Sequence, residues 1–121
     1  LVRCVFLDDL RKTPPGWQRV YTAWEAIALC QEGVSDLSLD YDLDGVPHSG
    51  GYGGNTHPGT GGDVSKWLLK QAQIGNWDWV PVHIRIHSSN QDGVEEMAWD
   101  LAELERLRFA RVLDVPPEEM W

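Results

Sequence analysis

Four aspartates stand directly after two apolar segments of the chain. Asp8 and Asp9 follow the first segment, and Asp40 and Asp42 follow the second. Carboxylates held close together repel one another, and the repulsion is relieved when one is protonated or when a hard cation that prefers oxygen ligands binds between them. If the two segments are neighbouring strands, these side chains predict a site for Mg2+ or Mn2+.

A third group of polar residues follows a segment in which apolar and polar side chains alternate. His87, Ser88 and Asn90 come directly after residues 80–86. The imidazole of His87 can donate or accept a proton near neutral pH, or donate a hydrogen bond to a phosphate oxygen. We therefore expect His87 to act beside the acidic cluster, provided that the fold brings the two groups together.

These groups can lie together only if the strands that precede them end at one edge of a sheet. The sequence alternates strand-like and helix-like segments, as such a sheet requires. Apolar patterning predicts strands at residues 2–7, 17–21, 37–40 and 80–86, with 109–113 as a candidate fifth strand. Helical spacing predicts helices at residues 23–31 and 63–73, and a third helix that Asn90 or Asp92 caps and that reaches about Leu104.

The order of these segments predicts the α/β class. We expect a small doubly wound, mostly parallel, flavodoxin-like sheet with a shortened first crossover, in a single domain of residues 1–121 whose tail from about residue 114 has no assigned structure. Helices should cover both faces of such a sheet, and ligands should bind outside the carboxyl ends of its strands. The polar groups described above lie at those ends.

The start of the first helix has a local signal of its own. Thr22 and Glu25 have the spacing of a capping box, in which each side chain accepts a hydrogen bond from a free backbone amide at the helix start. Helical periodicity then places Trp24, Ile27 and Ala28 on one face. We expect this face to pack against the sheet.

Composition limits the classes of partner. The chain has 121 residues, which suits one hydrophobic core, and its 10 basic and 19 acidic residues give a formal charge of −9. This charge disfavours extended nucleic acid but is compatible with a small phosphate-bearing ligand bound through a cation. No segment approaches the ~20 apolar residues of a membrane span, and no signal peptide is recognisable, so we expect a cytoplasmic protein without membrane binding. The seven tryptophans fit core packing or a homo-oligomer interface.

Residues 50–62 form a glycine-rich segment with seven glycines in thirteen positions. The segment lacks the Gly-Lys-Ser or Gly-Lys-Thr ending of a P-loop, so hydrolysis of nucleoside triphosphates is not indicated. Its backbone amides could still hold a phosphate, above all at the helix that begins after Thr60. A lid over the ligand is the competing interpretation.

Two other known sites share part of the acidic pattern. Residues 40–45 match the opening of an EF-hand calcium loop, but position twelve would be Gly51 instead of a bidentate glutamate, and we reject this interpretation. Residues 42–46, Asp-Leu-Asp-Gly-Val, resemble the nucleophile motif of haloacid-dehalogenase-type phosphatases, and Ser88 resembles that family's second motif. No lysine follows Lys70 and no late acidic pair provides the remaining metal ligands, so a remnant of such a phosphatase is only an alternative.

Four segments together carry a more specific resemblance. FLDDLR, SLDYDLDG, TGGDVSKWL and IRIHSSNQDG resemble the cyclic-phosphate-processing receiver-like family of the response-regulator receiver superfamily, whose pattern has DDxR, SLDHDLG, a TG-led helix and HSxNP. The resemblance extends from Phe6 to about Leu104. It implies a receiver-like fold in which Asp8, Asp9 and Asp40 hold the metal, Arg11, Thr60, Ser88 and Asn90 contact the substrate, and Asp40 and His87 are catalytic.

The resemblance also implies the activity. We expect metal-dependent binding or hydrolysis of a phosphate, cyclic phosphates included, on a nucleotide or an RNA end, so that a metal-dependent phosphoesterase is possible. The chain departs from the family pattern at Tyr41, where the pattern has His, and at Gln91, where it has Pro. The first departure removes a proton-transfer group. A noncatalytic signalling or protein-interaction domain is the alternative, although residues 109–114 lack the lysine that an ordinary phosphorelay receiver needs.

Overall fold

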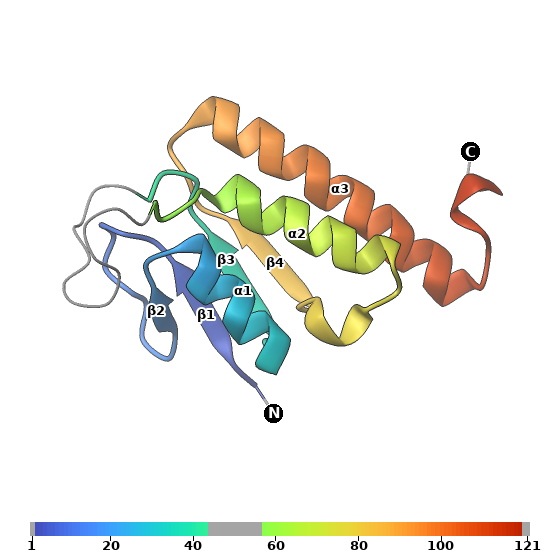
Figure 1. Ribbon diagram of the computed structural model, residues 1–121, viewed down its shortest axis with the longest axis horizontal. Coiled ribbons are helices and arrows are strands. Elements are labelled where there is room, and N and C mark those ends of the chain that lie inside the picture. Colours follow the sequence, from blue (N-terminus) through green and yellow to red (C-terminus); the bar gives the residue numbers. More distant parts are fainter. Residues whose placement is uncertain (1, 44–56, 120–121) are drawn as a thin grey trace.

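Four parallel strands form the sheet of this protein. A computed structural model describes residues 2–43 and 57–119, and the strands follow the order β2-β1-β3-β4 (Figure 1). Their bounds are β1 (Cys4–Leu7), β2 (Gln18–Val20), β3 (Asp36–Leu39) and β4 (His83–Ile86). Leu7 lies opposite Leu39, and Leu39 lies opposite Ile86, so β1, β3 and β4 end at the same level. The predicted α/β class is confirmed, and the polar groups that follow these strands share one edge.

Three α-helices connect or follow the strands: α1 (Ala23–Glu32), α2 (Gly61–Gln73) and α3 (Gln91–Leu113). The predicted capping box begins α1, since Thr22 Oγ1 accepts a hydrogen bond from the Glu25 amide and the Glu25 carboxylate accepts from the Thr22 amide. Asn90 caps α3 as predicted, because its Oδ1 accepts a hydrogen bond from the Gly93 amide at 2.9 Å. Two short 3-10 helices, η2 (Trp77–Trp79) and η3 (Pro117–Glu119), complete the described elements.

The core lies between the helices and one face of the sheet. Alternate strand residues, among them Leu7, Leu37 and Leu39, form one buried cluster with residues of all three helices. The connections from β2 to β3 and from β3 to β4 run in the same direction across the sheet, and right-handed connections therefore carry their helices to the same face. Figure 1 shows α1 and α2 crossing the sheet together, with α3 beside α2.

The other face of the sheet is not covered by a helix among the described residues. The connection from β1 to β2 runs in the opposite direction and would place its helix on that face, but residues 8–17 contain none. The prediction that helices cover both faces is therefore wrong for this part of the chain, and the predicted shortened first crossover is the reason. Phe6 and Ser38 are nevertheless buried on this face. The Trp17 ring lies edge-on to Phe6, and the Arg85 guanidinium lies over the Trp17 ring.

The prediction of a fifth strand at residues 109–113 is wrong. α3 continues through this segment and ends at Leu113, and the next residue, Asp114, has a left-handed backbone with φ 58°. A short apolar run is common to strands and helices, and periodicity alone does not separate them. The ion pairs of Arg106 with Glu103 and of Arg108 with Glu105 join neighbouring turns and favour the helix.

The predicted buried face of α1 is only partly right. Ile27 packs against the core, but Trp24 is 46% exposed and Ala28 is exposed, whereas Ala23, Ala26 and Cys30 are buried. Small side chains allow the helix to approach the sheet closely, and the large indole is left at the margin. There Trp24 Nε1 donates a hydrogen bond to the carbonyl of His57 at 3.0 Å.

None of the helices in residues 2–43 and 57–119 combines the length and the apolar character that crossing a bilayer requires.

Candidate functional site

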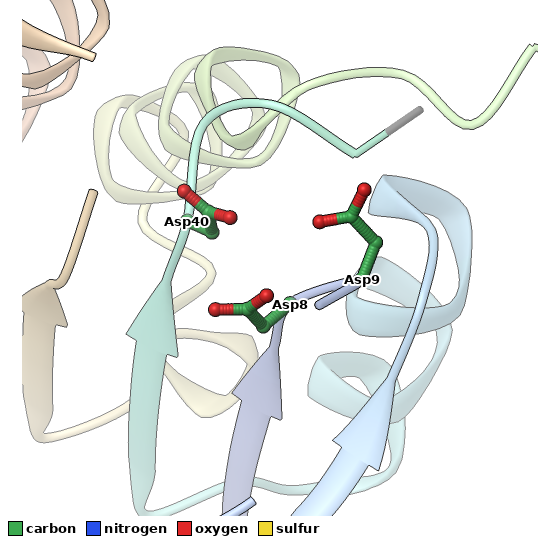
Figure 2. Close-up of side chains that lie close together, drawn as sticks. All are labelled: Asp8, Asp9 and Asp40. Atoms are coloured by element: carbon green, nitrogen blue, oxygen red, sulfur yellow. The ribbon is translucent and has the colours of Figure 1, made fainter. Parts of the chain in front are cut away.

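Three carboxylates meet at the edge of the sheet where β1 and β3 end. Asp8 and Asp9 follow β1 and Asp40 follows β3, and one oxygen from each side chain lies within 4.8 Å of the other two (Figure 2). The pairing of the two strands continues to this point, because the Asp40 amide donates to the Leu7 carbonyl at 3.0 Å. Among the described residues this is the only group of three or more potential metal ligands.

The three carboxylates line an open pocket of about 230 Å³. Its other lining residues are Leu10, Arg11, Asp42 and Ser89. The structure therefore brings together the four aspartates that the sequence predicted and adds two residues, Leu10 and Ser89, that it did not single out. Both stand beside predicted residues in the sequence, but nothing in their chemistry marked them.

Asp8 is fully buried and held on both oxygens. Its Oδ1 accepts hydrogen bonds from the amides of Leu10 and Arg11 at 2.8 and 2.9 Å, and its Oδ2 lies 2.9 Å from His87 Nε2. Burial raises the pKa of Asp8, but these hydrogen bonds and the nearby imidazole outweigh it and lower the pKa below its ordinary value. Asp8 is therefore the carboxylate that most readily stays ionised.

Asp40 has the opposite electrostatic environment. Burial and the charge of Asp8 raise its pKa above the ordinary value, although hydrogen bonds from the Tyr41 amide, at 2.8 Å, and from Ser88 oppose the shift. A carboxylate pushed toward protonation by a neighbouring anion is stabilised when a cation binds between the two. The pocket thus has an excess of negative charge that a divalent ion would relieve.

His87 reaches this cluster from behind the pocket. Its Nε2 contacts Asp8, its Nδ1 lies 2.6 Å from Ser38 Oγ, and its ring stacks on Phe6 with centroids 4.3 Å apart and planes 4° apart. The prediction that His87 lies beside the carboxylates agrees with this geometry. However, His87 does not line the pocket, and both of its ring nitrogens have protein partners, so it contacts Asp8 and not the pocket space.

The four residues predicted to contact substrate have different surroundings. Arg11 lines the pocket, is exposed, and places its Nε 4.0 Å from Asp8 Oδ2. Thr60 instead caps α2, because its Oγ1 accepts from the Asp63 amide, and it is absent from the pocket wall. The first residue of α2 packs closely against the end of β3, because a Cβ on Gly61 would overlap the carbonyl oxygen of Asp40.

Ser88 and Asn90 support the carboxylates without lining the pocket. The Ser88 side chain hydrogen-bonds Asp40, and its Oγ accepts from the Asn90 amide at 3.1 Å. Asn90 uses Oδ1 to cap α3 and donates from Nδ2 to both oxygens of Asp42, at 3.1 and 3.3 Å. Of the four residues, Arg11 alone lines the pocket, whereas Ser88 and Asn90 hydrogen-bond Asp40 and Asp42.

Tyr41, the departure from the family pattern, lies outside the pocket wall. A Cβ on Gly93 would overlap its ring, and its hydroxyl donates to Glu96 at 3.3 Å. The side chain therefore packs between the starts of α2 and α3. Asp44, His48 and residues 50–56 of the glycine-rich segment lie outside the described residues.

The acidic cluster fits Mg2+ by its chemistry and spacing. Mg2+ prefers oxygen ligands at about 2.1 Å in octahedral geometry, so its ligand atoms lie roughly 3 to 4 Å apart. The three carboxylate oxygens, all within 4.8 Å of one another, are close to this spacing. Asp8, Asp9 and Asp40 are therefore the residues that could hold the ion.

Comparison with known proteins gives one match. The sequence model of a family described as the cyclic-phosphate processing receiver domain matches residues 3–103. No curated protein and no solved structure matches the chain.

Proposed function

The chain belongs to the cyclic-phosphate processing receiver domain family, and from this premise we propose that it binds a phosphate group through a divalent cation held by Asp8, Asp9 and Asp40. The ligand that we propose is a phosphate, cyclic phosphates included, on a nucleotide or an RNA end. The single observation that supports this most is the convergence of three carboxylates from two strands in one open pocket.

The charges of the pocket make phosphate binding depend on the cation. Its wall contains four aspartates and one arginine, so an anion alone would be repelled. A bound Mg2+ supplies positive charge that neutralises the carboxylates and polarises a phosphate. Arg11 is the one basic residue of the described wall, and its guanidinium can pair with a phosphate oxygen beside the ion site.

Hydrolysis of a bound phosphoester is the reaction that this arrangement supports best. In this proposal Asp40 would hold the cation beside the phosphate, and the cation would polarise the phosphate or activate a water molecule. In this proposal His87 contributes through Asp8, since its ring nitrogens contact Asp8 and Ser38. Ser88 and Asn90 support the pocket carboxylates, because Ser88 hydrogen-bonds Asp40 and Asn90 donates to Asp42.

Titration calorimetry with Mg2+, followed by a panel of 2',3'-cyclic and 3',5'-cyclic nucleotides, tests the proposal. We expect Mg2+ to bind the wild-type chain and nucleotide to bind only in its presence. Asp40→Ala should abolish both, whereas Asp78→Ala, which removes an exposed carboxylate on η2, should abolish neither. Wild-type affinity for Mg2+ in the Asp40→Ala variant would exclude the proposed site.

A signalling receiver is the second candidate, because Asp40 follows β3 inside an acidic cluster, as the phosphate-accepting aspartate of a receiver does. Residues 109–113, where a last strand would present a lysine, belong to α3 and contain none. Incubation with acetyl phosphate and Mg2+ separates the two functions. Stable phosphorylation of Asp40 without turnover of any cyclic nucleotide would favour signalling.

A further inference from the structure

A line of hydrogen-bonded side chains leads from the middle of the sheet to the pocket. Ser38 Oγ lies 2.6 Å from His87 Nδ1, and His87 Nε2 lies 2.9 Å from Asp8 Oδ2. We propose that Ser38 is a positioning residue for the cation site, which acts through His87 to fix the carboxylate of Asp8. This inference rests on the proposed function and assigns a role to a residue that the site itself does not contain.

The position of Ser38 is unusual for a serine. It lies in β3 between Leu37 and Leu39, in register with Phe6 and Arg85, and it is only 7% exposed. Strands inside parallel sheets are mostly apolar, and a buried hydroxyl is costly unless it forms a hydrogen bond. The bond to His87 offsets that cost and accounts for a polar side chain in the middle of this strand.

When the imidazole of His87 is neutral, the chemistry of the three groups assigns the direction of each hydrogen bond. An ionised Asp8 only accepts, so Nε2 of the imidazole must carry the proton that it donates. In a neutral imidazole Nδ1 is then an acceptor, and among its partners only the Ser38 hydroxyl can supply the matching proton. Ser38 therefore selects the tautomer of His87 that donates to Asp8.

Two further contacts prevent the imidazole and the carboxylate from moving independently. The ring of His87 stacks on Phe6 with the planes 4° apart, so the ring cannot tilt freely. The contacts of its two nitrogens with Ser38 and Asp8 prevent the ring from rotating within that plane. The amides of Leu10 and Arg11 hold the other oxygen of Asp8. The carboxylate is thereby presented to the cluster in one orientation, and loss of such supporting groups typically weakens metal binding about 10- to 100-fold.

The test compares three serine variants of the full chain. Ser38→Ala removes the hydroxyl, Ser38→Thr keeps it, and Ser65→Ala is the matched control, because Ser65 is fully buried and its hydroxyl donates to Asp100 at 2.7 Å away from the pocket. Calorimetry measures Mg2+ affinity, nitrogen-15 NMR of the imidazole measures the His87 tautomer, and thermal unfolding in chelator measures folding. Only the tautomer and the affinity report on positioning.

We expect Ser38→Ala to lower Mg2+ affinity roughly 10- to 100-fold and to reduce the population of the tautomer protonated at Nε2. Ser38→Thr should retain both properties, and Ser65→Ala should leave both unchanged whatever its effect on the unfolding temperature. If Ser38→Ala does not fold, Ser38→Cys replaces it with the same expectation, since it keeps the size of the side chain but offers only a weak donor.

Two results overturn the inference, and they are distinguishable. If the wild-type chain binds Mg2+ and Ser38→Ala binds it equally well with the same His87 tautomer, Ser38 does not position the site and the proposed function survives. If the wild-type chain binds no Mg2+, the proposed function fails and the role of Ser38 in it fails with it.

Discussion

Asp8 and Asp40 stand at the ends of two paired strands, and their pKa values are shifted in opposite directions. Asp8 is held below its ordinary pKa by two backbone amides and the imidazole of His87, while burial and the charge of Asp8 raise the pKa of Asp40. Asp8 is stabilised as an anion, and the repulsion from its charge destabilises the ionised form of Asp40. Neutralising Asp8 and neutralising Asp40 should therefore change the free energy of unfolding in opposite directions.

Replacing Asp40 with Asn should stabilise the fold while it abolishes cation binding. A group whose pKa is raised by folding destabilises the folded chain when it is ionised, so removing its charge should raise the free energy of unfolding near pH 7. The gain should shrink as the pH falls through the raised pKa of folded Asp40, and it should vanish below the ordinary pKa of aspartate, where the carboxylate is neutral in both states. Urea unfolding across this pH range, in chelator, measures the effect. A variant less stable than wild type near pH 7 would contradict it.

Asp8→Asn should have the reverse effect on stability. The pKa of Asp8 is lowered by folding, so its ionised form stabilises the folded chain above the ordinary aspartate pKa, and this contribution is lost as the pH falls through the lowered value. We expect the variant to lose roughly 1 to 3 kcal/mol near pH 7, because the amides of Leu10 and Arg11 and the imidazole of His87 lose a charged acceptor. The difference from wild type should narrow in acid. Equal stability of the two proteins near neutral pH would show that the buried carboxylate contributes nothing.

Gly61→Ala should destabilise the protein even though alanine is the better helix former. A Cβ at this position overlaps the backbone carbonyl of Asp40, which cannot rotate away, and overpacking of this kind costs about 1 to 3 kcal/mol. Helix propensity alone would give a gain of about 1 kcal/mol. Lys70→Ala, on the exposed side of the same helix, is the control. Thermal and urea unfolding of both variants decide which effect prevails, and a stabilised Gly61→Ala variant would mean that the contact is relaxed in solution.

Arg11→Ala should separate binding of the ligand from binding of the ion. The guanidinium lines the pocket, but Asp8 is held by the backbone amide of Arg11, which the substitution leaves in place. We expect affinity for a cyclic nucleotide in saturating Mg2+ to fall tenfold or more, as for loss of a hydrogen bond to a charged group, with Mg2+ affinity changed less than threefold. Lys12→Ala, which removes the neighbouring exposed charge, is the control. An equal loss in both variants would point to a general electrostatic effect.

The sequence predicted the acidic cluster of Asp8, Asp9 and Asp40 because each of these residues directly follows a segment that reads locally as a strand. Apolar runs indicate where β1 and β3 lie, and parallel pairing brings the residues after two such strands to one edge, so the proximity of Asp8, Asp9 and Asp40 follows from their places in the chain. The caps at Thr22 and Asn90 were predictable for the same reason, since a helix start is defined by neighbouring residues.

Only the tertiary structure decided what the other polar groups contact. Thr60 uses its oxygen to cap α2 and does not line the pocket, and His87 contacts Ser38 and Asp8, which are 49 and 79 positions away in the sequence. A strand pattern gives the face on which a side chain lies but not the atom that it meets there. The sequence by itself therefore determined the α/β class and the acidic edge of the sheet. The packing of β1, β3 and β4 against one another decided that His87 supports Asp8 and that Ser38 supports His87, because hydrogen bonds between residues so far apart exist only when the strands are in register.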